Sequence, residues 1–285
     1  MRQFKDKVIC ITGVGSGIGR ALAIKLNAAG VKLALNDYNV SGLEETISML
    51  PNQDLPHIAE VFDVSDRESV YAFSEKVLQR FGQVDGCINN AGVALGTVSV
   101  DRLSYEDFDW IFGINFWGMV YGTKAYLPMI KQQTEGFIAN VSSIFGIAGI
   151  AYQTAYCTTK FAIRGFNESL RMEMHVEAPH VKIHSIHPGG IKTNIAKDSK
   201  VAIGMEEQMA KQNDEKLADI EKAFITSPGD AADIIISGVN RKKERIMIGS
   251  DAKKVDRLVR LFPEKYTGML LKNSDMAKLR VDEEV

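Results

Sequence analysis

Tyr156 and Lys160 lie four residues apart in a stretch whose pattern predicts a helix, so their side chains would share one face. A phenol normally keeps its proton to about pH 10, which makes it a poor base at neutral pH. A nearby ammonium group favours the phenolate and would lower the pKa of Tyr156. The phenol could then exchange a proton with a carbonyl or alcohol oxygen. Alone, this spacing is a weak signal, because it is common by chance.

A hydroxyl group ends the predicted strand that precedes this helix. Ser143 stands at the carboxyl end of that strand, and ligands bind at the carboxyl ends of the strands in a parallel sheet. Its hydroxyl could donate to the same substrate oxygen and stabilise charge that develops there. The alternative is that Ser142 and Ser143 only cap a turn.

The first predicted strand, residues 7–13, leads through a glycine-rich turn into a helix. The turn contains Gly13, Gly15, Ser16, Gly17, Ile18 and Gly19. Glycines allow a sharp turn and close approach to a ligand, and the start of a helix offers free N–H groups to a pyrophosphate. The strict G-x-G-x-x-G spacing is not met, because Ile18 stands where the third glycine would fall. The turn therefore indicates a dinucleotide site only together with other residues.

Carboxylates end the next two predicted strands. Asp37 ends the second, where a carboxylate would accept hydrogen bonds from the adenosine ribose and repel a 2′-phosphate. This favours NAD, although Arg20 beside the turn could help to bind the phosphate of NADP. Asp63, at the end of the third strand, could bind an adenine amino group. It could equally be an acid at the start of the following helix.

Apolar runs alternate with helical patterns along the chain. Strands are predicted over 7–13, 31–37, 57–64, 84–92, 136–143, 181–190 and 245–250, and helices over 17–30, 40–50, 66–82, 104–130 and 155–177. This alternation predicts βαβ units and a parallel sheet with both faces covered. Since no linker or repeat divides it, we expect one domain over 1–285. It would carry a substrate-lid insertion over about 194–225 and a C-terminal helical extension over about 252–285.

The composition is close to that of soluble globular proteins, with 45% hydrophobic and 25% charged residues. The formal net charge of -2 argues against nucleic-acid binding, which needs a basic excess. The apolar run near the N-terminus stops at glycines and no run reaches the length of a membrane span, so we expect neither a signal peptide nor a membrane-spanning helix. Scattered cysteines and histidines lack metal-ligand spacing, so we expect no metal and a reducing, cytoplasmic location.

The motifs in their order closely resemble those of the short-chain dehydrogenase/reductase family, over roughly residues 5–193 and part of the last strand. They are TGVGSGIG (12–19), DV (63–64), NNAG (89–92), Asn115, Ser143, YCTTK (156–160) and HPGGIKT (187–193). The resemblance implies an α/β, doubly wound, Rossmann-type fold with about seven parallel strands and helices on both faces. It also implies an NAD(P)-dependent oxidoreductase that acts on CH–OH groups through Asn, Ser, Tyr and Lys.

The resemblance also implies a role for each matching residue. Tyr156 would be the general acid/base, and Lys160 would lower its pKa and bind the nicotinamide ribose. Ser143 would orient the substrate oxygen, and Asn115 would hold a water that links Lys160 to solvent. Further cofactor contacts are implied at Asp63, Val64, Asn89, Ala91, Gly92, Pro188, Gly189, Ile191 and Thr193.

The substrate is expected to be a fairly hydrophobic secondary alcohol or its ketone. Leu95 and Phe145 would supply an apolar wall, and Met205 and Met209 an adaptable lid. The alternative is that these residues only pack on one another. Two other functions stay open: a cofactor-binding regulatory protein without turnover, and an epimerase or dehydratase that uses the same Tyr-Lys pair.

The sequence suggests two surface contacts, one through residues 253–262 and one between subunits. Residues 253–262 form a basic amphipathic pattern that could lie on a membrane surface, although docking on the domain or at a subunit interface is favoured. The family resemblance suggests a homodimer or homotetramer through the helices at 104–130 and 155–177.

Overall fold

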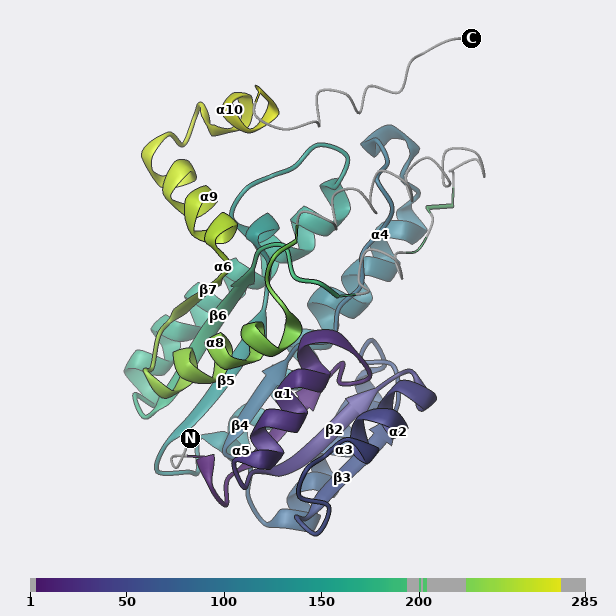
Figure 1. Cartoon of the computed structure of the whole chain (residues 1–285), viewed down its shortest axis with the longest axis vertical. Helices are drawn as coiled ribbons and strands as arrows, with labels where there is room; N and C mark the ends of the chain where they lie inside the picture. Colours follow the sequence, from purple (N-terminus) through teal and green to yellow (C-terminus); the bar gives the residue numbers. More distant parts are fainter. Residues whose placement is uncertain (1–3, 194–199, 201, 204–223, 273–285) are drawn as a thin grey trace.

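The centre of the molecule is a sheet of seven parallel strands, which confirms the doubly wound, Rossmann-type fold. The structure is a computed structural model that describes residues 4–193, 200, 202–203 and 224–272 (Figure 1). The strands lie in the order β3-β2-β1-β4-β5-β6-β7. They are β1 (Val8–Thr12), β2 (Lys32–Asp37), β3 (His57–Val61), β4 (Gly86–Asn89), β5 (Gly136–Val141), β6 (Val181–Pro188) and β7 (Arg245–Ile248). The strand order reverses between β1 and β4, and such a reversal creates a crevice for ligands.

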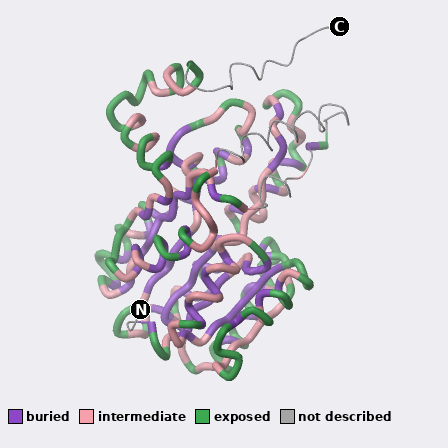
Figure 2. The backbone as a smooth tube through the Cα atoms, in the orientation of Figure 1, coloured by how far each residue is buried: buried purple, intermediate pink, exposed green. Residues whose placement is uncertain are grey.

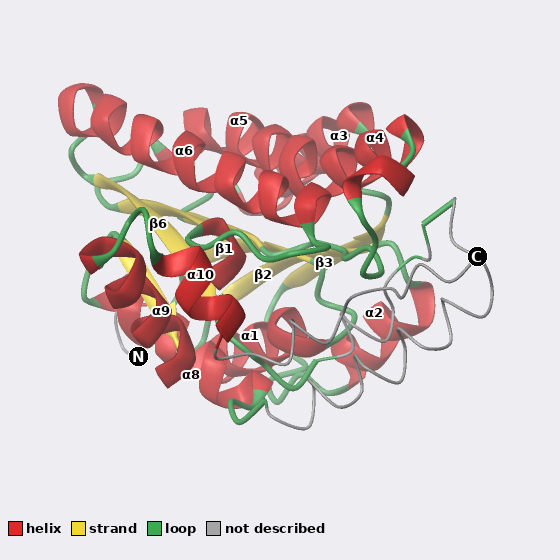
Figure 3. Ribbon diagram, turned by 90° about the horizontal axis from the view of Figure 1, so that it is seen from above, coloured by secondary structure: helices red, strands yellow, loops and turns green. Residues whose placement is uncertain are grey.

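Helices cover both faces of the sheet (Figure 3). One face carries α1 (Gly17–Ala28), α2 (Val40–Ser48) and α8 (Pro228–Asn240), and the other carries α3 (Arg67–Phe81), α4 (Tyr105–Phe112), α5 (Gly118–Ile130) and α6 (Thr154–Glu177). Successive strand residues face opposite sides. Ile9 and Ile11 therefore join one core cluster, whereas Val8 and Cys10 join the other. The inner strands are accordingly buried on both faces (Figure 2), whereas the edge strand β3 is only partly covered.

The helix predicted over 104–130 forms, but a π-helical turn, η3 (Gly113–Trp117), separates α4 from α5. The start of α4 is fixed by a capping box, in which Ser104 Oγ accepts a hydrogen bond from Asp107 N–H and the Asp107 carboxylate accepts one from Ser104 N–H. Two short 3₁₀ turns of the described residues are η2 (Val100–Arg102) and η4 (Ile144–Gly146). π-helical turns are often found at functional sites, and Asn115 lies inside this one.

Residues 228–240 form α8, a helix that the sequence pattern does not predict. Ser227 caps this helix by accepting a hydrogen bond from Asp230 N–H, and Pro228 occupies its first turn. The isoleucine run within it is as typical of a buried strand as of a helix, so periodicity alone did not reveal it.

The C-terminal extension contains α9 (Ser250–Leu261) and α10 (Tyr266–Lys272), which project from the carboxyl end of the sheet (Figure 1). The predicted amphipathic helix at 253–262 falls almost wholly within α9, where Ala252 alone is buried. No helix of the described residues is long and apolar enough to cross a bilayer. Nearly all of the predicted insertion at 194–225 lies outside the described residues, as does the extension beyond 272.

Candidate active site

Adjacent serines at the carboxyl end of β5 have different partners. Ser142 Oγ donates to the main-chain carbonyl of Lys160 across 2.8 Å, and thereby ties α6 to β5. Gly146 permits this approach, because a Cβ there would overlap both Ser142 Oγ and the Lys160 carbonyl. Ser143 Oγ accepts a hydrogen bond from Phe145 N–H at 3.1 Å and also hydrogen-bonds the Tyr156 phenol. Ser143 thus caps η4 and still faces Tyr156, whereas Ser142 is structural.

The Tyr156 phenol is held in its neutral form. Burial raises the pKa of Tyr156 to about 12, and the hydrogen bond from Ser143 only partly opposes this shift. The Lys160 ammonium lies 5.4 Å from the centroid of the Tyr156 ring. In the chain by itself, desolvation of the phenolate sets the direction of the shift, and the predicted lowering of this pKa by Lys160 stays a prediction.

Lys160 is itself buried and has no carboxylate partner among the described residues. Desolvation lowers the pKa of Lys160 to about 8. Its Nζ donates to the Val141 carbonyl at 3.2 Å. A Cβ built on Gly92 would lie 3.3 Å from Lys160 Nζ and 3.1 Å from Asn115 Oδ1. The amine and the amide therefore meet beside a residue that has no side chain.

Asn115 fixes the loop that follows β4. Its Oδ1 accepts from Val93 N–H at 2.8 Å, and its Nδ2 donates to the Val93 carbonyl at 3.0 Å and to Thr159 Oγ1 at 3.2 Å. The helix α6 and the loop after β4 are thus joined through one amide inside η3. The implied water between Asn115 and Lys160 stays a prediction.

The glycine-rich turn forms a cradle at the start of α1. Gly13 and Gly17 adopt positive φ of 68° and 54°, a region that favours glycine. A Cβ on Gly19 would overlap the Gly13 carbonyl. Ser16, the N-cap residue, makes no side-chain capping hydrogen bond, so it leaves the first-turn N–H groups of α1 available. This geometry fits a pyrophosphate.

Asp37 borders this cradle and is largely buried. Its Oδ2 accepts from Gly15 N–H at 2.7 Å, and its Oδ1 accepts from Asn39 N–H at 2.9 Å. The Arg20 guanidinium pairs with Glu45 at 2.6 Å and also donates to the Gly15 carbonyl. The basic group that could have assisted NADP is therefore already engaged, whereas the carboxylate lies at the cradle.

The acid after β3 makes a local turn. Asp63 Oδ1 accepts from Ser65 N–H at 2.8 Å, whereas the N-cap of α3 is Asp66. Asp63 is thus not the helix cap, and its predicted adenine contact stays a prediction. Val64 is buried against Gly118, where a Cβ would lie 2.7 Å from Val64 Cγ2.

The asparagines at the end of β4, Asn89 and Asn90, form hydrogen bonds in different parts of the molecule. The Asn89 amide donates to Asn140 Oδ1 at 2.7 Å and to Thr123 Oγ1 at 3.1 Å, inside the core. Asn90 instead donates to the Gly13 carbonyl at 2.9 Å, and its own N–H donates to Thr12 Oγ1. The side chain that shapes the cradle is therefore that of Asn90, which is not among the predicted cofactor residues. The signal was its place in the NNAG motif.

The loop after β6 runs from the sheet edge to the cradle. Gly189 N–H donates to the Ile248 carbonyl at 2.9 Å, and Lys192 N–H donates to the Thr226 carbonyl at 3.0 Å. Ile191 forms a bridge with Thr226. Thr193 lies against Gly17, where a Cβ would be 3.1 Å from Thr193 Cγ2. The structure thus brings Thr193, the last residue of this predicted stretch, next to the glycine-rich turn.

The predicted substrate residues separate into different groups. The Phe145 ring meets the Tyr156 ring edge-on, with 6.1 Å between centroids. Leu95 is buried in a cluster with Ile111 and Ala155, against which Tyr156 packs, so it contributes to the core beside the site. Met205 and Met209 lie outside the described residues.

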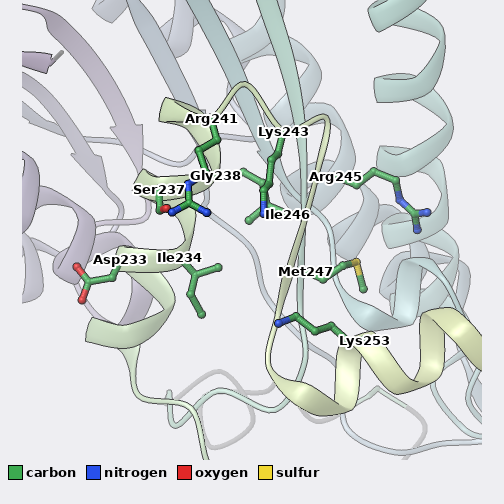
Figure 4. Close-up of a pocket in the computed structure, with 10 residues that line it drawn as sticks. All are labelled: Asp233, Ile234, Ser237, Gly238, Arg241, Lys243, Arg245, Ile246, Met247 and Lys253. Carbon is green, nitrogen blue, oxygen red and sulfur yellow. The ribbon is translucent and has the colours of Figure 1, made fainter.

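Other features of the described chain lie apart from this site. Among these residues, no group of His, Cys, Asp or Glu could hold a metal ion, and the cysteines are free and buried. A groove of about 460 Å³ lies between α8, β7 and α9, at the open edge of the sheet (Figure 4). It is lined in part by Arg241, Lys243 and Lys253, and includes none of the predicted catalytic or cofactor-binding residues.

Comparisons with known proteins agree with this geometry. Residues 7–203 match the family model described as short chain dehydrogenase. An oxidoreductase of Mycobacterium tuberculosis, SadH, is 41% identical over 267 residues, which span 93% of this chain and 94% of that protein. Levodione reductase of Leifsonia aquatica is 33% identical over 201 residues, covering 69% of this chain and 74% of the relative. A short-chain dehydrogenase/reductase from Burkholderia phymatum, solved in complex with NAD, superposes with a TM-score of 0.85 at 26% identity and covers 93% of this chain and 96% of its own.

Proposed function

Because the chain belongs to the short-chain dehydrogenase family, whose members are oxidoreductases that use a nicotinamide cofactor, we propose that it interconverts a hydrophobic secondary alcohol and its ketone. The observation that carries this proposal is that Ser143 and Lys160 both lie close to Tyr156, at the carboxyl end of the sheet. The proposed substrate oxygen lies between the Ser143 hydroxyl and the Tyr156 phenol.

The cofactor would be held along the crevice between β1 and β4. Its pyrophosphate would lie on the cradle from Gly13 to Gly19, and its adenosine ribose would meet Asp37. The nicotinamide half would lie near Lys160 and the loop 188–193. When bound, this cofactor supplies or accepts the hydride. The chain orients the reacting groups and manages the proton.

The neutral phenol suits the direction of ketone reduction. With the pKa of Tyr156 raised to about 12, the phenol is protonated at neutral pH and can donate to a carbonyl oxygen as the alcohol forms. The Ser143 hydroxyl can stabilise charge at the same oxygen. Lys160, whose pKa is lowered to about 8, can exchange protons at mildly alkaline pH more readily than an ordinary lysine. We therefore favour reduction near neutral pH.

NAD is the proposed form of the cofactor. A carboxylate at the position of Asp37 repels a 2′-phosphate, and the one nearby guanidinium considered for NADP, that of Arg20, is paired with Glu45. The solved Burkholderia relative contains NAD, which supports the same choice.

A small, apolar carbonyl compound is the proposed substrate class. Phe145 lies edge-on to Tyr156, and the adjoining wall is formed by Leu95, Ile111 and Ala155. Lys200, a cation at this wall, lies over the Trp110 ring at 4.9 Å and 3.6 Å from Asp107, so the wall itself presents apolar side chains. Levodione reductase, by its name, acts on a ketone, which fits the proposed class.

We also propose that the protein is cytoplasmic and forms a homodimer or homotetramer. Aromatic side chains are exposed on the two segments predicted to form the subunit contact, 104–130 and 155–177. They include Trp117 (47% exposed) and Phe161 (38% exposed). Large exposed apolar groups on adjacent helices are typical of subunit interfaces. Sedimentation analysis of the purified protein tests this assembly.

The deciding experiment is a fluorescence titration with NADH and NADPH, followed by assays with a panel of alcohols and ketones. We expect tighter binding of NADH, turnover of apolar ketones, and loss of turnover in Tyr156→Phe with cofactor binding retained. A regulatory protein would bind cofactor without turnover in any variant. An epimerase would convert its substrate without net formation or consumption of NADH, so either result would refute the proposal.

A further inference from the structure

A carboxylate of the C-terminal extension contacts the loop 188–193. Asp251, in the first turn of α9, accepts a hydrogen bond from Gly190 N–H at 2.7 Å. A Cβ on either Gly189 or Gly249 would overlap the Asp251 carboxylate. The carboxylate thus fits a space that two glycines leave free, one on the loop and one at the N-cap of α9.

The contact completes the attachment of this loop to the rest of the molecule. Main-chain hydrogen bonds already join Gly189 to Ile248 and Lys192 to Thr226. Gly190 lies between these points, and its N–H donates to Asp251. The loop then reaches Thr193, which lies against Gly17 of the cradle. Asp251 is therefore placed to control where the loop crosses the crevice.

A simpler role for Asp251 would be to stabilise α9. An acid in the first turn of a helix interacts favourably with the helix dipole. The observed hydrogen bond, however, runs to Gly190, a residue outside α9. An acid that served the helix alone would not require Gly189 to lack a side chain, whereas the positive φ of 95° at Gly249 favours glycine in any case.

We propose that Asp251 is a positioning residue for the nicotinamide half of the cofactor, acting through Gly189 and Gly190. This inference rests on the proposed dinucleotide site. The carboxylate holds the loop so that Ile191 and Thr193 face the nicotinamide. The adenosine half, bound by the cradle and Asp37, does not depend on it.

The test compares two ligands with the full-length protein and the variant Asp251→Ala. NADH presents both halves of the dinucleotide, whereas ADP-ribose lacks the nicotinamide ring. Because a hydrogen bond to a charged group is lost, we expect the Kd for NADH to rise about tenfold, with the Kd for ADP-ribose unchanged within about twofold. Equal Kd values for NADH in the variant and the wild type would overturn the proposal, as would equal weakening of both ligands.

Two further variants distinguish a role of Asp251 in positioning the loop 188–193 from a general disturbance of α9. Asp251→Asn keeps an acceptor oxygen and should restore most of the NADH affinity. Asp256→Ala removes a different α9 acid, which pairs with Arg245 at 2.8 Å, and should leave both ligands unaffected. If Asp256→Ala weakens NADH as much as Asp251→Ala, the effect belongs to α9 as a whole and the proposal fails.

A double-mutant cycle provides a second readout. Gly189→Ala should weaken NADH binding because its methyl group overlaps Asp251, and adding Asp251→Ala should relieve part of that loss. Strictly additive losses would contradict the proposed contact. The outcomes also distinguish the two proposals. A wild-type protein that binds neither NADH nor NADPH refutes the proposed function, whereas wild-type binding that is unchanged in Asp251→Ala refutes only the positioning role.

Discussion

The Ser142 hydroxyl donates a hydrogen bond to the main-chain carbonyl of Lys160 across 2.8 Å, from the end of β5 to the second turn of α6. Ser142 and Lys160 are both buried, so this hydrogen bond holds the part of α6 that carries Lys160 against the end of β5. The neighbouring Ser143 makes no bond to α6 backbone and instead faces the phenol. Ser142 thus has a structural role, whereas Ser143 is placed to take part in the chemistry.

We expect alanine at these two positions to give opposite results. Ser142→Ala leaves the buried Lys160 carbonyl without this partner, and should lower the free energy of unfolding by about 1–3 kcal/mol. Ser143→Ala should lower kcat about 100-fold, because it removes a donor to the reacting oxygen, with little loss of stability. Urea unfolding and steady-state kinetics measure the two effects. A stable Ser142→Ala with strongly reduced kcat would show that the roles are not divided in this way.

Replacement of Asp37 should change the choice of cofactor. In Asp37→Asn the charge that repels a 2′-phosphate is lost, whereas the side chain keeps its shape and an oxygen for Gly15 N–H. We expect the ratio of NADPH to NADH affinity to rise about tenfold or more. Asp63→Asn is the matched control, since that carboxylate lies at the end of another strand. Fluorescence titrations of both variants give the ratios, and an unchanged ratio in Asp37→Asn would remove the basis for assigning NAD.

Burial of Lys160 should make folding stability depend on alkaline pH. The pKa of Lys160 falls from 10.5 to about 8 on folding, so between these values the unfolded chain binds a proton that the folded chain has released. Stability therefore rises as the pH increases from about 8 toward 10, because linkage favours the state that binds fewer protons. Above pH 10 the raised pKa of Tyr156 has the opposite effect, since the folded chain then keeps a proton that the unfolded chain loses.

The variant Lys160→Met tests this dependence. It should be more stable than the wild type near pH 7, by about 1–3 kcal/mol, and the difference should shrink toward pH 10. Lys124→Met, at an exposed position of α5, is the control and should follow the wild type at every pH. Urea unfolding at intervals of pH provides the measurement. Parallel curves for Lys160→Met and the wild type would mean that Lys160 is not buried as described.

Much of the fold and the site could be predicted because both depend on local spacing. Apolar runs that alternate with helical patterns fixed the order of strands and helices. The glycine-rich turn, Asp37 and the Tyr156–Lys160 pair follow directly from neighbours in the chain. Each lies at the carboxyl end of a strand or the start of a helix, where the parallel sheet brings them together.

The remainder depends on contacts between distant segments. The direction of the pKa shift at Tyr156 follows from burial, which the spacing of Tyr156 and Lys160 does not reveal. Asn89 and Asn90 are adjacent and identical, and only the strand register shows which one meets the core and which the cradle. The contact of Asp251 with Gly190 joins residues from α9 and the loop after β6, so no local pattern could predict it.

Gly92 offers a direct test of the space between Asn115 and Lys160. A methyl group there would lie 3.1 Å from Asn115 Oδ1 and 3.3 Å from Lys160 Nζ, closer than ordinary packing allows. Gly92→Ala should therefore displace one of these groups, lowering kcat about tenfold or more for a misplacement of well under 1 Å. Gly165→Ala is the matched control, because its Cβ would meet nothing within 4 Å and it lies on α6, the helix that carries Tyr156.

That control should keep full activity, and it should gain about 0.4–1 kcal/mol of stability, as expected when alanine replaces glycine inside a helix. Kinetics and thermal unfolding of the two variants measure both effects. If Gly92→Ala turns over at the wild-type rate, then Asn115 and Lys160 do not need to meet beside residue 92. The implied water link between Asn115 and Lys160 would then not be needed for turnover, although Tyr156 could still act as the proton donor.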